Sequence, residues 1–319
     1  MVFDTGRGIH KLENQSFLDI ESNLLPVPRP RAGHAWYCLL FWNKQLSQEH
    51  YIWFIKLPID EHSLLQQAAR NQFLEVVVTA LGKDIAKSEQ ALPDNPFIYQ
   101  PSQQQLADIN AISHYLLNVP ERAAKIAVEH YFNAPSVQDW QQLSLQGIAD
   151  YVARLNDANM HTLSQVLPNL PKALQISLMS SLESASLNTS LTNSLISLYD
   201  ESTDIAVRHA CARAVSAATD EHQQQLFLSH MLQQSLDQES LVIIAGRYWP
   251  LLAQSADSLM TYMNKVAEFD VSHRLFIGIY SDLVQVPATR AGLLALLRNP
   301  DKPDALTAAI GRLFSGAQA

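Results

Sequence analysis

Residues 204–218 read Asp-Ile-Ala-Val-Arg-His-Ala-Cys-Ala-Arg-Ala-Val-Ser-Ala-Ala. This stretch is typical of the inner helix of a HEAT-like helix pair, and similar segments recur around it. The recurrence predicts an α-solenoid, a fold that provides broad binding surfaces and rarely carries catalysis. The repeat therefore indicates the shape of the protein and says little about a reaction or a ligand.

The repeat becomes visible when the second members of successive helix pairs are placed in register. Their spacing runs from about 29 to about 34 residues, which is within the range of helical repeats and below the usual HEAT length. Small residues, among them Gly147, Ala210, Ala214 and Gly278, are expected to let neighbouring helices approach closely. The segments in register are 145–149, 174–178, 204–218, 241–245 and 275–279.

Strand patterns are confined to the N-terminal region. Residues 34–42 and 51–57 are rich in aromatic and β-branched side chains, which favours an antiparallel pair. Residues 2–4 and 9–12 flank a Thr-Gly-Arg-Gly turn and predict a hairpin. A helix over residues 60–81, with Asp60 as its N-cap, is expected to cover one face of this small sheet.

Prolines mark the end of this region. Three of them lie between Leu92 and Ser102, where they remove backbone donors and discourage helix. We therefore expect a sheet-plus-helix region over residues 1–91, a Pro-rich linker over 92–101 and a HEAT-like repeat domain over 102–319. The fold class is mainly α, an α-solenoid of antiparallel helix pairs preceded by a small N-terminal α/β (α+β) region. Its helices are expected at 102–117, 120–132, 136–155, 159–166, 172–184, 190–199, 204–218, 221–235, 238–253, 257–268, 271–286, 288–297 and 303–314.

Charge is distributed unevenly along the 319 residues, whose formal net charge is −9. The first 56 residues carry six basic and five acidic side chains, so the excess of acid belongs to the rest of the chain. A negative helical body repels phosphate backbones, which disfavours nucleic-acid binding. A nucleic-acid interface would require a basic stripe, for which the available residues are Arg208, Arg213, Arg247 and Arg274.

No targeting segment is visible in the sequence. The longest apolar runs fall far short of the roughly 20 residues that cross a bilayer, and the start shows no secretory signal. Cytoplasmic localisation is therefore the expectation. The two cysteines, Cys38 and Cys211, have no CxxC spacing and are expected to be small core side chains.

A search for catalytic motifs finds none of the common signatures. The eleven histidines are scattered, and no two of them have the i, i+3 or i, i+4 spacing that places two metal ligands on one helix face. The Asp-Glu-His triplets at 60–62 and 220–222 are interpreted as helix starts, where carboxylates are favoured by the dipole. We therefore assign no catalytic residue, metal site or cofactor.

The repeat register places a row of polar residues on the inner helices. These residues, Arg154, Glu183, Arg213, Arg247 and Ser281, have two interpretations. They form a concave face that binds a protein partner, or they form a solvated face stabilised by stacked ion pairs.

The N-terminal region offers a second candidate site. The Thr5–Gly8 turn is suited to an anion-binding nest with Arg7 and Lys11 nearby, and its alternative is a plain hairpin turn. Trp36, together with Trp42 and Trp53, is placed to line a groove for a peptide or small ligand, or to form an aromatic core between sheet and helix. Arg7, Lys11 and Trp36 are the ligand-binding candidates.

An ordered set of motifs resembles a gammaproteobacterial family, domain of unknown function 3549, over nearly the whole chain. The motifs are Val2–Arg7 with His10–Leu12, His34–Trp36 with Leu40–Trp42, Trp53–Pro58, and Trp140 with Leu145–Asp150. Individually each motif is weak, and the order makes the set specific. The resemblance implies a lineage and carries no activity, cofactor or catalytic residue. It also implies a helix upstream of the first strand, whereas this chain starts at Met1 directly before it.

Four functions are compatible with the sequence. The leading one is a cytoplasmic scaffold whose helical array binds a protein partner. The alternative is a ligand-sensing or regulatory module that binds a small molecule or peptide near Arg7, Lys11 and Trp36. An enzyme would need a constellation that only the fold assembles. A nucleic-acid-binding protein would need the basic stripe named above.

Overall fold

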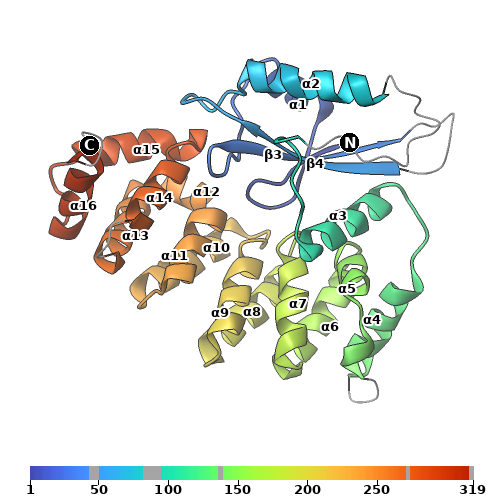
Figure 1. Cartoon of the computed structure of the whole chain (residues 1–319). Coiled ribbons are helices and arrows are strands. Elements are labelled where there is room, and N and C mark those ends of the chain that lie inside the picture. Colours follow the sequence, from blue (N-terminus) through green and yellow to red (C-terminus); the bar gives the residue numbers. More distant parts are fainter. Residues whose placement is uncertain (43–49, 82–94, 136–138, 271–273, 316–319) are drawn as a thin grey trace. The chain divides into compact units, whose positions relative to one another are not determined.

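The computed structural model describes residues 1–42, 50–81, 95–135, 139–270 and 274–315 (Figure 1). These residues hold four strands and sixteen α-helices, and they group into two compact units. The helical unit consists of Pro101–His273 and Pro303–Ala309. The sheet unit consists of Met1–Gln100, Arg274–Lys302 and Ile310–Ala319.

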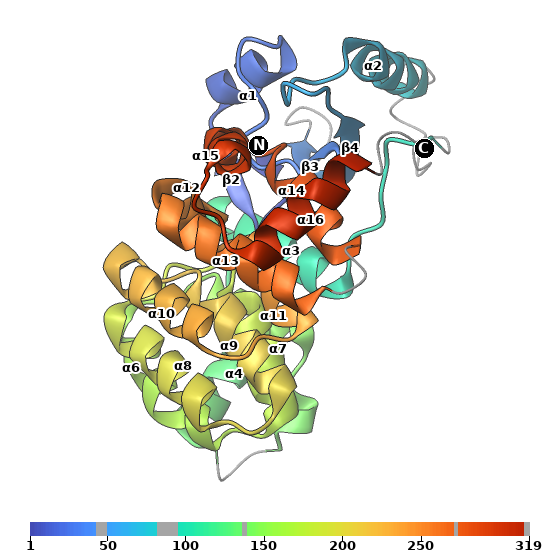
Figure 2. The same ribbon diagram turned by 90° about the vertical axis from the view of Figure 1, so that its left-hand side faces the viewer.

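The helical unit is a two-layer stack of antiparallel helix pairs, as the repeat predicts. In one row α5, α7, α9 and α11 pack on one another in turn, and in the other row α4 packs on α6, α6 on α8, and α10 on α13. Figure 2 shows α6, α8 and α10 along one side and α7, α9 and α11 along the other. The helices are α3 (Gln103–Leu116), α4 (Ala123–Asn133), α5 (Leu145–Val152), α6 (Asp157–Val166), α7 (Lys172–Leu182), α8 (Thr189–Glu201), α9 (Ile205–Val215), α10 (Glu221–Gln233), α11 (Gln238–Arg247), α12 (Trp249–Gln254) and α13 (Ala256–Phe269).

Most of these helices begin at a side-chain cap. Asp204 accepts hydrogen bonds from the backbone N–H groups of Ala206 and Val207, and Asp220 accepts them from His222 and Gln223. These bonds satisfy donors that have no partner inside the helix. The capping role expected for Asp220 is confirmed.

Two of the expected helices are interrupted. The segment expected at 238–253 divides into α11 and α12, because Pro250 has no N–H to continue the helical ladder. The segment expected at 136–155 begins outside the described residues. It then forms a 3₁₀ turn, η1 (Trp140–Gln142), before α5. A second 3₁₀ turn, η2 (Leu167–Asn169), follows α6.

Small residues allow close helix packing at some of the expected positions. An added Cβ at Gly147 would lie 2.7 Å from the carbonyl oxygen of Ala124 on α4, and Ala210 and Ala214 of α9 are fully buried. An added Cβ at Gly278 would meet no atom within 4 Å, so the expectation that this glycine admits a neighbouring helix is wrong.

The sheet unit contains an antiparallel sheet in the order β2-β1-β3-β4. Its strands are β1 (Val2–Asp4), β2 (His10–Leu12), β3 (His34–Trp42) and β4 (His50–Pro58). β1 pairs with β3 from Val2 opposite Leu39 to Asp4 opposite Tyr37. Gly8, in the turn between β1 and β2, has a φ of 127°, a conformation that glycine adopts readily. β1 pairs with β2 and β3 pairs with β4, both antiparallel, so the expected hairpin and the expected antiparallel pair are confirmed.

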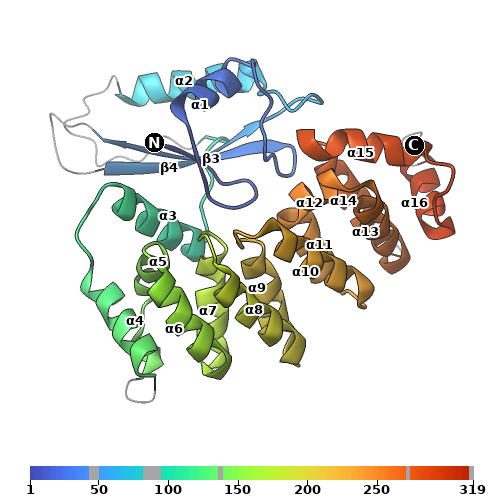
Figure 3. The same cartoon turned by 180° about the vertical axis from the view of Figure 1, so that it is seen from behind.

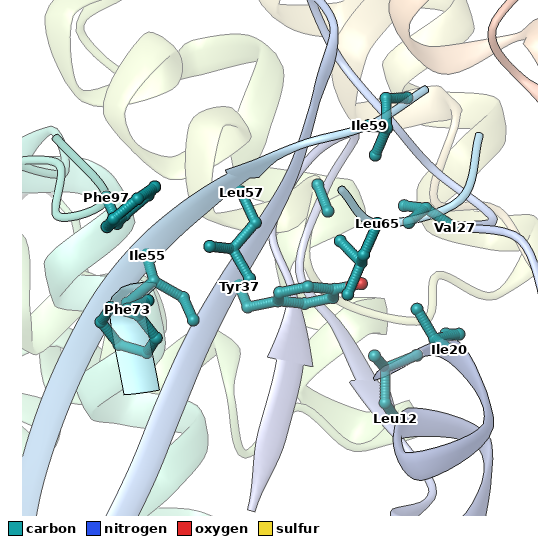
Figure 4. Close-up of a cluster of buried hydrophobic side chains, with 11 residues drawn as sticks. Leu12, Ile20, Val27, Tyr37, Ile55, Leu57, Ile59, Leu65, Phe73 and Phe97 are labelled. Atoms are coloured by element: carbon teal, nitrogen blue, oxygen red, sulfur yellow. The ribbon is translucent and has the colours of Figure 1, made fainter. Parts of the chain in front are cut away.

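Helices α1 (Asn14–Glu21) and α2 (Gln67–Leu81) cover one face of this sheet (Figure 3). Between them and the strands lies a core with Tyr37 near its centre (Figure 4). Every second side chain along β3 and β4 is apolar and points to this face, which explains why the strands pack beneath helices. The core residues are Leu12, Ile20, Val27, Ala35, Tyr37, Ile55, Leu57, Ile59, Leu65, Phe73 and Phe97.

The sequence misplaced the start of α2 and did not predict α1. Asp60 accepts hydrogen bonds from the N–H groups of His62 and Leu64, at 2.9 and 2.8 Å, and so closes a turn instead of capping a helix. Ser63 within this turn has a φ of 64°, which an α-helix excludes. The helix therefore begins seven residues later, at Gln67.

The units also differ from the domains that composition suggests. Helices α14 (Arg274–Leu283) and α15 (Pro287–Arg298) belong to the sheet unit, although the sequence assigned 102–319 to one helical domain. Helix α16 (Asp304–Ser315) has residues in both units. Part of the expected linker, residues 92–94, lies outside the described residues. Phe97 and Tyr99 continue the sheet by hydrogen-bonding to the backbone of β4.

Candidate functional site

Three inner helices of the helical unit bring charged side chains into one cluster. Glu183 accepts from Arg213 (Nε to Oε1, 3.1 Å) and from Arg247 (Nη2 to Oε2, 2.8 Å). Arg213 also contacts Glu239, with 3.0 Å between Nη1 and Oε1. We call these four residues the Glu183 network. It joins three of the four residues that the sequence proposed for partner binding.

The position of each residue along its helix explains the network. Glu183 is the C-cap residue of α7, Arg213 lies in the last turn of α9, and Arg247 is the last residue of α11. Arginines near helix C-termini are stabilised by the helix dipole, and one carboxylate between them offsets their mutual repulsion. The side chains of Glu183, Arg213 and Arg247 are 14, 25 and 29% exposed. Ion pairs therefore connect successive inner helices at these residues, and part of each arginine still faces solvent.

Next to the network, one face of α11 is open to solvent. Glu239 and Val242 are exposed, and Gly246 has no atom within 4 Å of where a Cβ would stand. The three residues follow the i, i+3, i+7 spacing of one helix face. We call them the α11 face. Glu239 and Val242 were not among the residues proposed from the sequence, although their spacing within 238–253 is a signal from which they could have been found.

The other two members of the proposed row have different surroundings. Arg154 donates to the carbonyl oxygen of Val119 at 3.0 Å, and its Nε is 4.0 Å from Glu121. Ser281 is an exposed residue of α14 in the sheet unit. The row is therefore not one continuous ladder, because Arg154 has partners of its own and Ser281 belongs to the other unit.

Helix α3 packs against two inner helices through polar contacts. Ser181 of α7 donates to Asp108 Oδ1 at 2.8 Å, and Gln104 donates to both carboxylate oxygens of Asp108 at 3.0 Å. On α5, Gln146 donates to the carbonyl oxygen of Ala107. Burial raises the pKa of Asp108 to about 6, and the nearby Glu183 adds to the rise. α3 thus occupies the surface of α5 and α7, and the Glu183 network lies beyond it along the row.

In the sheet unit, Arg7 points inward. Its side chain is 2% exposed, and its guanidinium contacts Asp282 of α14, with 2.5 Å between Nη2 and Oδ2. Its Nε donates to the carbonyl oxygen of Pro30 at 2.8 Å. Lys11, by contrast, is an exposed residue of the edge strand β2. The structure therefore gives Arg7 a carboxylate partner from the far end of the chain.

Trp36 is contacted by two cations and by the aromatic rings of Tyr99 and His34. The guanidinium carbon of Arg31 lies 4.2 Å from the centre of the indole, and Nζ of Lys56 lies 5.7 Å from it. Tyr99 packs edge-on at 4.7 Å, and the indole Nε1 donates to the carbonyl oxygen of Arg31. Trp53 packs against the sheet core, as the aromatic-core interpretation predicts, and the side chain of Trp42 lies outside the described residues.

A buried carboxyl lies beside the Arg7 turn. Asp4 Oδ1 accepts from the N–H of Gly6 at 2.9 Å. Burial raises the pKa of Asp4 to about 6, against the lowering effects of that hydrogen bond and of Arg29 and Arg7. This turn therefore holds its charges in a dry environment, where an ion pair is stronger than in water.

Neither a metal centre nor a membrane helix is found in the described parts of the chain. No three histidine, cysteine, aspartate or glutamate side chains there are grouped as metal ligands. Among the helices that the structure describes, none combines the length and the apolar character needed to cross a bilayer.

Comparison with known proteins identifies one family. A family model described as "Protein of unknown function (DUF3549)" matches residues 1–314, in agreement with the resemblance of the ordered motifs. No curated protein and no solved structure matches the chain. The match extends through both the sheet unit and the helical unit. The chain therefore belongs to the DUF3549 family.

Proposed function

We propose that this protein is a cytoplasmic scaffold of a bacterial cell that binds a protein partner through the inner row of its helical unit. The observation that carries the proposal is the Glu183 network beside the exposed α11 face. One carboxylate holds two partly exposed arginines, and Arg213 also contacts Glu239, which shares a helix face with the exposed Val242. Preordered arginines next to an apolar contact are a common composition of protein interfaces.

The packing of α3 supports this location. Because α3 occupies the surface of α5 and α7, the accessible part of the inner row is the stretch from the end of α7 to α11. Gly246 extends this stretch with open space where a Cβ would stand, so a partner can approach this side of α11 closely. The proposal assigns recognition to surface contacts and includes no catalytic step.

The alternative, a sensor that binds a ligand near Arg7, Lys11 and Trp36, has less support. Arg7 is directed at Asp282, Lys11 projects from an edge strand, and Trp36 contacts Arg31, Lys56 and Tyr99. These three candidates therefore make separate sets of contacts.

The test is an affinity pull-down from a lysate of the host, with mass spectrometry. Wild-type protein is compared with Val242→Arg, which places a bulky charge on the α11 face, and with Leu226→Arg. Leu226 is an exposed residue of α10 in the opposite row, so its variant controls for an added surface arginine. Both positions are exposed, and we expect both variants to fold.

The proposal predicts a partner that wild type and Leu226→Arg enrich and that Val242→Arg loses. A partner retained by Val242→Arg would exclude the α11 face, and no enriched protein would remove the support for a scaffold. This design is sharper than reversing Arg213 and Arg247 to glutamate, because those changes would also leave Glu183 among like charges and destabilise the stack.

A further inference from the structure

The carboxylate of Asp282 is held on both oxygens by groups that are more than 240 residues away in the sequence. Oδ2 accepts from Arg7 Nη2 at 2.5 Å, and Oδ1 accepts from the backbone N–H of Ala32 at 2.9 Å. One residue further on, the N–H of Gly33 donates to Oε1 of Gln285 at 2.9 Å. Two successive backbone donors and one guanidinium thus face acceptors from the end of α14 and the turn after it.

The loop that supplies these donors has an uncommon backbone. Ala32 and Gly33 have φ values of 48° and 76°, both in the left-handed region. Glycine adopts this region readily, whereas alanine rarely does, and such positions cluster at sites that bind ligands. Successive N–H groups directed to one side of a turn are a frequent way of binding an anion.

Arg7 supplies the third donor group that faces Asp282 and Gln285. Its side chain is 2% exposed, and the bond from Nε to the carbonyl oxygen of Pro30 fixes the guanidinium plane. A guanidinium held in this way presents its remaining N–H groups in one direction and pairs strongly with a carboxylate or phosphate. The sequence allowed an anion-binding nest in the Thr5–Gly8 turn, with a plain hairpin turn as the alternative. In the structure the backbone donors come from the Ala32–Gly33 turn instead.

The segment that fills this arrangement is attached by polar contacts. Gln285 accepts from Ser63 through its carbonyl oxygen, and Arg290 of α15 donates to Ser63 Oγ, both at 2.5 Å. Apolar side chains of α14 and α15, among them Phe276, Leu283 and Leu293, are fully buried as well, and none of them belongs to the sheet core cluster. An added anion can compete for these donors directly, because it offers the same guanidinium and N–H groups another acceptor.

From these contacts we propose that Arg7 and the N–H groups of Ala32 and Gly33 form a binding site for a carboxylate or phosphate group. Asp282 is its internal occupant, and an anionic ligand displaces it. Occupation by the ligand releases the end of α14 from the Ala32–Gly33 turn. The site therefore couples the binding of an anion to the attachment of α14 and α15 within the sheet unit.

The test compares the full-length wild type with Asp282→Asn, which removes the internal negative charge and keeps the size of the side chain. Inorganic phosphate and succinate are the two probes, each titrated by calorimetry, and the tighter one identifies the source of the anionic group. We expect Asp282→Asn to bind one of them at least about tenfold more tightly than wild type, because the competing carboxylate is absent. Asp301→Asn is the control, since Asp301 is an exposed acid beyond α15.

A second measurement locates the site. Hydrogen exchange at Ala32 and Gly33 in Asp282→Asn should slow when the tighter probe is added, and exchange in α14 of wild type should accelerate. Adding Arg7→Lys to Asp282→Asn should weaken binding again, because lysine cannot keep the bond to Pro30 and reach the ligand together. Equal affinity in wild type and Asp282→Asn, an equal gain in Asp301→Asn, or unchanged exchange at Ala32 and Gly33 would each overturn the proposal.

Discussion

The contact between α4 and α5 predicts that Gly147→Ala destabilises the helical unit. A Cβ at residue 147 would lie 2.7 Å from the carbonyl oxygen of Ala124, 3.0 Å from its carbonyl carbon and 3.2 Å from its Cβ. Two of these atoms are backbone, so α4 must shift to admit one methyl group. Overpacking of this kind costs about 1–3 kcal/mol, and the better helix propensity of alanine returns at most about 1 kcal/mol. We expect a net loss of about 1–2 kcal/mol.

The same substitution at Gly278 is the matched control. Gly278 lies within α14, and a Cβ added there would meet no atom within 4 Å. Alanine at this position therefore gains helix propensity without a clash. We expect Gly278→Ala to be neutral or to stabilise by up to about 1 kcal/mol. Urea unfolding followed by far-UV circular dichroism measures both variants against wild type. Gly147→Ala at wild-type stability or above would refute the close approach of α4 and α5.

Three further changes test other contacts. Glu183→Gln leaves two arginines without their shared carboxylate and should cost about 1–3 kcal/mol in urea unfolding; a loss below about 0.5 kcal/mol would mean that solvent already screens the network. Ala214→Arg puts a charge at a fully buried position and should cost about 3–5 kcal/mol, and an unchanged melting temperature would contradict that placement. Burial raises the pKa of Asp108 from 3.8 to about 6. The protonated carboxyl therefore contributes stability to the folded state that is fully present below pH 3.8 and is lost as the pH rises to about 6. Asp108→Asn should therefore reduce the fall in the free energy of unfolding across this pH window. Part of the fall should remain, because the pKa of Asp4 is also raised to about 6. An unchanged pH dependence would show that Asp108 does not contribute to it.

Local patterns were sufficient where the forces that set the structure are local. The strand over residues 34–42 and the repeat of helix pairs follow from side-chain periodicity, and Asp204 and Asp220 cap helices through bonds to residues two and three positions ahead. Asp60 shows the limit of this reasoning. The same residue type, also followed by Glu-His, closes a turn here, because Ile59 and Leu65 pair as a β-bridge that holds the chain out of a helix.

The two candidate sites differ in the kind of information they require. Arg213 contacts residues one repeat away, Glu183 on α7 and Glu239 on α11, so a repeat of about 30 residues predicts its neighbours once the register is known. Arg7 and Asp282 share no repeat, and neither the hairpin around Arg7 nor the helix around Asp282 contains a signal that relates them. An arginine in a glycine-rich turn predicts that an anion will be bound, because a buried guanidinium needs a counter-charge. It does not predict that the chain supplies the anion itself. The sequence therefore pointed to Arg7 as a ligand-binding residue, and only the structure shows that its partner is Asp282.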